Sequence, residues 1–344
     1  MKFGVSLYSY QVAYENGRMD LEACLKAMKE LPGNVDGVEI LADRKKYIPQ
    51  SPYIGTLSEA DQAKWKDLLA EYGMKATCYD SSLSAYALKP RKGPFKIERM
   101  TNPSKDEYDT QMEWFKSELD FCADFGFSTM RGPNLFGIYE EVIRDSLSYA
   151  SDHGIKVCME VHAPLKIKGD FVQSYAEMVD KACPGAGGFI PDFGIFYSHL
   201  PNPLIRKALS LGADPGMVKE IEAAYDAFED IGALAEKIKA KTDNEGIAEL
   251  LHTAGRSIRE NPEDLKEIGK YIYHVHAKFY EVDENYIEHG IDFEGPLKAL
   301  KDIGYSEYIS SEYEGQRIAV PEGLEEVEQV RRQTVMTQNI LEKL

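Results

Sequence analysis

Four short segments in the second half of the chain place acidic or basic side chains at the end of an apolar run. They read Val157-Cys158-Met159-Glu160-Val161-His162, Phe189-Ile190-Pro191-Asp192-Phe193, Tyr273-His274-Val275-His276-Ala277-Lys278 and Ile309-Ser310-Ser311-Glu312-Tyr313-Glu314. Because side chains alternate in direction along a strand, Glu160 shares a face with His162, and Glu312 shares one with Glu314. Burying carboxylates and imidazoles among apolar residues is costly unless they are paired or bind a metal. Their recurrence in successive segments therefore predicts a common polar site.

The candidate metal ligands are one residue from each segment, namely Glu160, Asp192, His276 and Glu312. Three carboxylates and one imidazole suit Mn²⁺ best, with Mg²⁺, Co²⁺ and Zn²⁺ as further candidates. A ligand charge of about −3 against +2 from the metal would leave the glutamates basic enough to exchange a proton with a substrate.

The elements that must position these residues alternate between short apolar strands and amphipathic helices. Eight strands are expected, at Phe3 to Tyr8, Gly37 to Leu41, Lys75 to Tyr79, Thr129 to Arg131, Lys156 to His162, Gly188 to Phe193, Tyr271 to Lys278 and Tyr308 to Glu314. A glycine turn at the end of a helix precedes several of them, as at Gly126 and Gly154. Apolar strands alternating with helices indicate a parallel sheet covered by helices. Eight such units favour a (β/α)₈ TIM barrel over an open sheet.

The chain is longer than a barrel requires. Of its 344 residues, about 250 would form the barrel, which leaves roughly 90 for insertions. We expect two insertions over the C-terminal face, at about 81–105 after the third strand and about 197–265 after the sixth. The second contains predicted helices near Pro203 to Leu211, Pro215 to Ile238 and Asn244 to Arg259. No linker or repeat divides the chain, so residues 1–344 are expected to form one TIM-barrel domain.

Composition excludes several classes of function. With 40 Lys and Arg against 58 Asp and Glu, the net charge of −18 argues against nucleic acid as the main partner. No apolar run approaches the roughly 20 residues of a membrane span, and the N-terminus has no signal-peptide pattern. The five cysteines are scattered, without a CxxC pair, so we expect reduced core cysteines and a cytoplasmic location.

The sequence resembles the xylose-isomerase-like TIM barrels, a superfamily of sugar phosphate isomerases and epimerases that also includes inosose dehydratase and endonuclease IV. The resemblance covers essentially the whole chain, from the opening Gly-Val-Ser-Leu and Gly37-Val38-Glu39-Ile40 to Ser311-Glu312-Tyr313. The family's E-x-H after the fifth strand matches Glu160 and His162. Its H-x-H matches His274 and His276, with the second histidine as the ligand, and its E-Y matches Glu312 and Tyr313.

The isomerase and epimerase members imply a divalent-metal-dependent reaction on a sugar or keto-sugar. The metal would stabilise an enediolate while a carbon-bound proton is removed. Glu160 and Glu312, on opposite sides of the metal, are the expected catalytic pair, and His162 is an alternative base. As a metal-dependent sugar isomerase or epimerase, the protein would take a small carbohydrate as its partner.

Four more polar residues are candidates for substrate binding: Arg131, Lys278, Glu314 and His274. Arg131 and Lys278 would hold a hydroxyl, carboxylate or phosphate of the substrate, or else pair with acids at the barrel rim. Glu314 would contact the substrate or lie in a solvated loop. For His274, the alternative is a packed, hydrogen-bonded core histidine.

A second chemistry, that of a C–C or C–O lyase, also fits. The sequence is similar to the catalytic subunits of C-glycoside deglycosidases, which cleave an oxidised sugar from an aromatic aglycone with the histidine of E-x-H as base. Many family members have a histidine three positions after the sixth-strand aspartate. This chain has Ile195 there, which favours the lyase over a ketose epimerase.

An inosose-dehydratase-like elimination and a non-catalytic sugar-binding barrel remain further alternatives. An enzyme of the endonuclease IV type would need more histidines than the seven present. We therefore expect neither a nucleic-acid nor a membrane partner, but a homo-oligomer or a small partner subunit would fit.

Overall fold

The computed structural model describes residues 1–41, 59–81, 100–132, 138–318 and 325–344. Eight parallel strands lie next to one another in the order β6-β5-β4-β3-β2-β1-β8-β7. They are β1 (Lys2–Ser6), β2 (Val35–Leu41), β3 (Lys75–Asp80), β4 (Thr129–Gly132), β5 (Lys156–Val161), β6 (Gly187–Pro191), β7 (Val275–Phe279) and β8 (Tyr308–Tyr313). Two parallel bridges, Phe189 with Ile272 and Asp192 with His276, join the two ends of this order. The predicted (β/α)₈ barrel is therefore confirmed as a nearly closed barrel.

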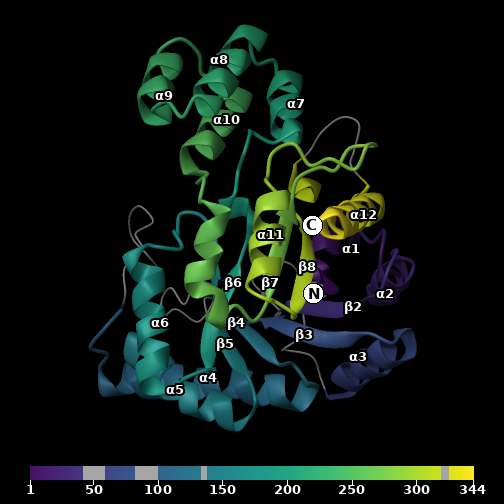
Figure 1. Ribbon diagram of the computed structural model, residues 1–344, viewed down its shortest axis with the longest axis vertical. Coiled ribbons are helices and arrows are strands. Elements are labelled where there is room, and N and C mark those ends of the chain that lie inside the picture. The colour runs from purple at the N-terminus through teal and green to yellow at the C-terminus, as the bar shows by residue number, and fades with distance from the viewer. Residues whose placement is uncertain (42–58, 82–99, 133–137, 319–324) are drawn as a thin grey trace.

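Helices connect the strands and surround them in Figure 1. They are α1 (Gln11–Glu15), α2 (Leu21–Lys29), α3 (Glu59–Tyr72), α4 (Lys105–Phe125), α5 (Glu140–Asp152), α6 (Asp170–Ala182), α11 (Glu294–Asp302) and α12 (Glu326–Lys343), with short 3₁₀ turns η1 (Leu7–Tyr10), η3 (Phe193–Ile195), η4 (Pro262–Tyr271) and η5 (Gly315–Arg317). A capping box of Ser104 and Glu107 begins α4, and Gly126 ends it with a φ of 96°. Gly154 after α5 has a φ of 71°, so these two glycines make the helix-to-strand turns that the sequence predicts.

Four more helices lie between β6 and β7, and Figure 1 shows them as a group at the top of the molecule. They are α7 (Asn202–Ser210), α8 (Pro215–Asp226), α9 (Ile231–Lys239) and α10 (Glu245–Arg256). The prediction of a single helix from Pro215 to Ile238 is wrong, because this segment forms the two helices α8 and α9. Phe228 has a φ of 59°, which interrupts the helix, and the Asp230 side chain accepts a hydrogen bond from Ala233 N and so begins α9.

The two predicted insertions and the single-domain assignment stay predictions. Most of the first insertion, at about 81–105, falls on residues 82–99, which lie outside the described residues. The second, at about 197–265, coincides with α7 to α10.

The hydrophobic core is formed largely between the strands and the helices, and Tyr79, Phe189 and Phe279 are among its largest fully buried side chains. Tyr79 packs against Phe121 in α4, and Phe189 packs against Tyr175 in α6. The acids and histidines buried beside this core include Glu39, Asp80, Glu160, Asp192, His274, His276 and Glu312, each no more than 6% exposed. The fold thus collects charged groups from several strands in one dry region, where they must neutralise one another or bind a cation.

The cysteines match the prediction of free thiols, because none forms a disulfide and all but Cys183 are buried. Within the described part of the chain, no helix combines the length and apolar character needed to span a bilayer. The cytoplasmic location stays a prediction.

Candidate metal centre and reaction cavity

His276 in β7 is the centre of the buried polar cluster. Its Nδ1 lies 2.7 Å from Glu160 Oε1, and its Nε2 lies 2.7 Å from Glu39 Oε2. A carboxylate oxygen only accepts hydrogen bonds, so both ring nitrogens donate and the ring is an imidazolium here. Burial opposes this charge, but Glu39, Glu312 and Glu160 together raise the pKa of His276 well above its ordinary value.

Three of the four predicted ligands come together around His276 Nδ1. One ligand atom each from Glu160, His276 and Glu312 lies within 4.8 Å of the other two. Glu312 Oε2, 3.5 Å from that nitrogen, is buried and has no hydrogen-bond partner among the described residues. Burial raises the pKa of Glu312 to about 8, and the charges of Asp192 and Glu160 add to this effect, while Lys278 and His276 oppose it.

This donor set fits a divalent cation. A buried carboxylate oxygen without a donor lies beside a second carboxylate and an imidazole nitrogen, which is the chemistry that Mn²⁺, Co²⁺ and Zn²⁺ accept. A cation here would replace the positive charge that the imidazolium supplies. The identity of the metal stays a prediction.

Asp192, the fourth predicted ligand, has other partners. Its Oδ2 lies 2.6 Å from Lys278 Nζ, and its Oδ1 accepts a hydrogen bond of 2.7 Å from Gly194 N. Lys278 Nζ also lies 3.7 Å from Glu312 Oε2, so it connects Asp192 to the cluster. The structure therefore brings Asp192 next to the three other ligands but not into their group, and it pairs Lys278 with acids.

Arg131 in β4 holds Glu160 in place from the other side. Its Nη1 lies 2.6 Å from Glu160 Oε2, and its Nη2 lies 2.6 Å from Asp80 Oδ2. Burial works against ionisation of Glu160, yet the charge of Arg131 and the hydrogen bond with His276 keep its pKa well below the ordinary value. Arg131, a predicted substrate contact, is thus engaged with two carboxylates.

His162 follows β5 and has the geometry of a general base. Its Nδ1 lies 2.7 Å from the carbonyl oxygen of Ala163, which can only accept, so Nδ1 carries the proton of the neutral ring. Its Nε2 is then the atom that can take up a proton, and it lies 3.7 Å from Glu160 Oε2. The side chain is 30% exposed, so a bound molecule can reach it.

A cavity of about 340 Å³ opens beside these residues. It is lined by His162, Ala163, Asp192, Gly194, Tyr197, His252, Thr253, Arg256, Ser257, Lys278, Tyr280 and Glu314. Glu314 accepts a hydrogen bond of 2.7 Å from the Tyr8 hydroxyl, and the hydroxyls of Tyr197 and Tyr280 are 2.7 Å apart. The cavity is large enough for a sugar-sized ligand. His274 and Arg131 are not part of its lining.

Comparison with known proteins places the chain in a family. A family model described as xylose isomerase-like TIM barrel matches residues 25–334. The chain belongs to this family. The resemblance stated from the sequence is therefore confirmed.

Sequence relatives of this xylose isomerase-like barrel are named as deglycosidases. The 3'-dehydrocarminate deglycosidase alpha subunit of a Microbacterium species is 26% identical over 221 residues, which are 60% of this chain and 63% of that protein. The C-glycoside deglycosidase alpha subunit of Arthrobacter globiformis is 23% identical over 329 residues, 91% of this chain and 83% of that one.

Solved structures share the fold. D-psicose 3-epimerase from Clostridium cellulolyticum H10 aligns with a TM-score of 0.55 at 14% identity and 99% coverage of each chain. The IOLI protein with a bound zinc atom aligns with a TM-score of 0.50 at 16% identity, over 100% of this chain and 99% of that one.

Sequence reasoning missed Glu39 and Asp80 as residues of the candidate site. Both stand at or near the end of an apolar strand, the same signal that identified the acids of the later strands, but it was applied only to the second half of the chain. His252 and Arg256 on α10 were missed for another reason. Nothing in a helix sequence says which cavity it borders, and His252 is exposed and lines the cavity.

Proposed function

We propose that this protein is a divalent-metal-dependent lyase that cleaves an oxidised sugar from an aromatic aglycone by proton abstraction and β-elimination. The observation that carries the proposal is His162, whose basic Nε2 borders the cavity while Glu160, a candidate metal ligand, lies directly behind it. The deglycosidase names of the sequence relatives support the same chemistry.

Glu160, His276 and Glu312 would hold the cation. When bound, a divalent metal supplies Lewis-acid polarisation of a substrate carbonyl, which acidifies the neighbouring C–H bond. His162 Nε2 would accept the proton from the carbon between the carbonyl and the glycosidic carbon. The electron pair of that C–H bond forms a carbon–carbon double bond, and the bond to the aglycone breaks with its electron pair. The aglycone leaves and takes up a proton, so no oxidant or reductant is consumed.

The walls of the cavity would hold the two halves of the substrate. Lys278 and Glu314 border it and can bind sugar hydroxyls, and Tyr197, Tyr280 and side chains of α10 form other parts of its wall. Aromatic and basic side chains suit a flat, electron-rich aglycone.

The test uses a 3-oxo C-glycoside with a chromophoric aglycone and the Mn²⁺-loaded chain. We expect aglycone release that is abolished by EDTA and restored by Mn²⁺. His162→Ala should retain Mn²⁺ but lose about 10²–10⁴-fold in turnover. His199→Ala, an exposed histidine paired with Asp226, is the matched control and should behave as wild type. Release that persists without metal, or in His162→Ala, would overturn this function.

Isomerisation or epimerisation of a free keto-sugar is the second candidate. Glu160 Oε1 and Glu312 Oε2 lie 2.7 Å and 3.5 Å from the same imidazole nitrogen, so both carboxylates would hold a metal bound there. Such a pair could remove and return a proton. Incorporation of deuterium from D₂O into a ketohexose, without aglycone release from the glycoside, would favour this candidate. Sugar binding without either reaction would indicate a non-catalytic barrel.

A second subunit is part of the proposal, because the relatives are named as alpha subunits. Light scattering on the protein purified from its natural source distinguishes the outcomes. A mass equal to a multiple of 38.8 kDa indicates a homo-oligomer, and an additional polypeptide at fixed stoichiometry indicates a partner subunit.

A further inference from the structure

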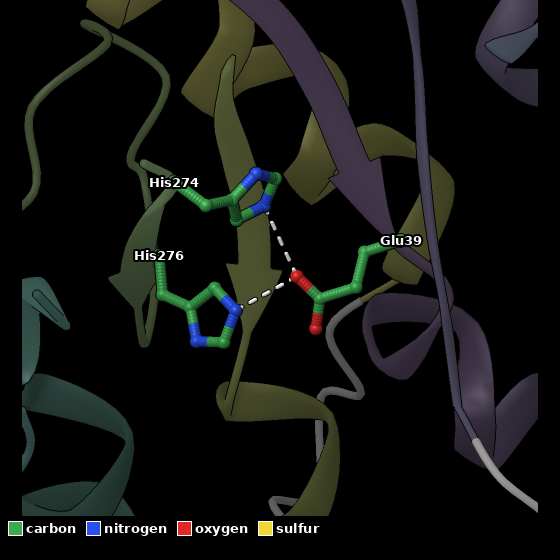
Figure 2. Close-up of side chains that lie close together, drawn as sticks. All are labelled: Glu39, His274 and His276. Carbon is green, nitrogen blue, oxygen red and sulfur yellow. Dashed lines mark hydrogen bonds and ion pairs between the residues drawn. The ribbon is translucent and has the colours of Figure 1, made fainter. Parts of the chain in front are cut away.

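Glu39, which no motif assigns to the site, makes three polar contacts inside the barrel. Ser6 Oγ donates a hydrogen bond of 3.2 Å to its Oε1. Its Oε2 lies 2.7 Å from His276 Nε2 and 3.2 Å from His274 Nε2. Figure 2 shows both imidazoles pointing at that single oxygen. The four side chains come from β1, β2, and the β7 segment, and each is at most 1% exposed.

The contact with Glu39 determines how the His276 ring is oriented. Nε2 must carry a proton to bond with the carboxylate, so Nδ1 is the ring atom left for a metal. With Nε2 held, Nδ1 faces Glu160 and Glu312, the other members of the candidate metal group. A flipped ring would turn a carbon toward Glu39 and remove a hydrogen bond from a dry interior, which is costly.

We propose that Glu39 is a positioning residue of the metal centre: it accepts the Nε2 proton of His276 and so directs Nδ1 at the cation. A carboxylate behind a ligating imidazole fixes both its tautomer and its orientation. Glu39 acts through His276 and does not touch the cavity. This inference rests on the metal of the proposed function, but it is the same for lyase and isomerase chemistry.

A competing arrangement shares these residues. Ligand atoms of Glu39, His274 and His276 also lie within 4.8 Å of one another, so they could themselves hold an ion. In that case His274 would be essential for binding, whereas under the proposal it only packs against Glu39. Substitution of His274 therefore separates the two arrangements.

Two conservative variants of Glu39 separate the effect of the position of its acceptor oxygen from the effect of its negative charge. Glu39→Gln keeps an acceptor oxygen at the same distance without the charge. Glu39→Asp keeps the charge but withdraws the carboxylate by about 1.5 Å, one carbon–carbon bond. If the position of the acceptor oxygen matters, Glu39→Gln should bind metal nearly as well as wild type and Glu39→Asp should not. If only the negative charge matters, the order reverses.

The readout is Co²⁺ binding by the metal-free chain, followed by its visible spectrum, with no substrate present. We expect Glu39→Asp to raise the dissociation constant about 10–100-fold and alter the spectrum. Glu39→Gln and His274→Gln should stay within about threefold of wild type. Glu326→Gln, which alters a buried carboxylate paired with Arg18 elsewhere, is the matched control and should bind as wild type. Cooperative thermal unfolding without metal checks that each variant folds.

The proposal is overturned if folded Glu39→Asp binds Co²⁺ with the wild-type constant and spectrum, or if Glu39→Gln is the weaker of the two. Loss of binding in His274→Gln would instead assign the ion to the competing group. If the wild-type chain itself binds no Co²⁺, Mn²⁺ or Zn²⁺, the proposed function fails together with this inference. Wild-type binding with an unaffected Glu39→Asp overturns the inference alone.

Discussion

Lys278 Nζ lies 2.6 Å from Asp192 Oδ2 and joins the ends of β7 and β6. Asp192 is 1% exposed and the lysine side chain 18%, so the acid of this ion pair is buried and the lysine is partly buried. Burial opposes the charge of Lys278, but Asp192 and Glu312 raise its pKa well above the ordinary value. The Lys278 ammonium therefore stays charged and is paired with Asp192, the carboxylate that a four-ligand metal site would need.

Removing this ammonium should destabilise the metal-free chain and make the chain more responsive to metal. Lys278→Met leaves the buried Asp192 carboxylate without its partner, which costs about 3–5 kcal/mol in the free energy of unfolding. Urea denaturation without and with Mn²⁺ measures the effect. Mn²⁺ should stabilise the variant more than wild type, because a cation can then neutralise Asp192. Lys168→Met, which breaks an exposed pair with Asp264, is the control and should change stability far less. Equal stabilisation by Mn²⁺ in both chains would contradict the prediction.

Arg131 should not be replaceable by lysine. Its two Nη atoms bind two different carboxylates, Asp80 and Glu160, and a single ammonium on a shorter stem cannot reach both. We expect Arg131→Lys to lower the free energy of unfolding by about 1–3 kcal/mol, because one buried carboxylate loses its donor. Urea denaturation measures this loss. Arg144→Lys, in an exposed contact with Asp145, should leave stability nearly unchanged, and an equal loss in both variants would refute the interpretation.

Arg256 should affect substrate binding without affecting stability. It lies at the end of α10, is exposed, borders the cavity, and has no acidic partner among the residues that the structure describes. On a substrate of the proposed kind, Arg256→Ala should raise KM roughly tenfold, the loss of about one hydrogen bond, with kcat little changed. Steady-state kinetics and thermal unfolding check both parts. Lys239→Ala on α9 is a matched surface control. A fall in kcat with constant KM would place Arg256 in the chemistry instead.

Glu288 should make stability depend on pH. Burial raises its pKa to about 7, although backbone N–H groups of Ile291, Tyr280 and Gly290 oppose the rise. The folded chain therefore holds this proton more tightly than the unfolded chain, whose ordinary glutamate pKa is 4.5. Its contribution is complete below pH 4.5 and is lost as the pH rises to about 7.

The contribution of this proton to the free energy of unfolding is about 2 kcal/mol after allowance for the partial exposure of Glu288. Urea denaturation from pH 5 to 8 of wild type and Glu288→Gln isolates it, because the variant cannot titrate. The difference in free energy of unfolding between wild type and Glu288→Gln should change over this pH range. The exposed Glu284→Gln should follow wild type, and parallel curves for Glu288→Gln and wild type would contradict the assignment.

The order of elements and part of the candidate site could be predicted from the sequence. Short apolar runs with amphipathic helices between them are a local pattern, and all eight strands were located from it. The alternation of side chains along a strand placed Glu160 and His162 on one face, and their contact at 3.7 Å is consistent with that. Strand ends in a parallel barrel meet at one rim, which is why Glu160, His276 and Glu312 could be grouped without coordinates.

The pairing of the buried charged side chains was decided only by the closed barrel. Glu39 is 237 residues from His276 along the chain, and Lys278 is 86 residues from Asp192. Side-chain alternation along a strand predicts which face a residue lies on. It does not predict whether that residue is a metal ligand, a hydrogen-bond partner of a ligand or a counter-ion. Long-range packing sets those roles, because a buried charge takes whichever opposite charge the fold brings within hydrogen-bond distance. The sequence determined a barrel with acids and imidazoles at its strand ends. The tertiary structure decided that Lys278 holds Asp192, that Glu39 holds His276, and that α10 borders the cavity beside them.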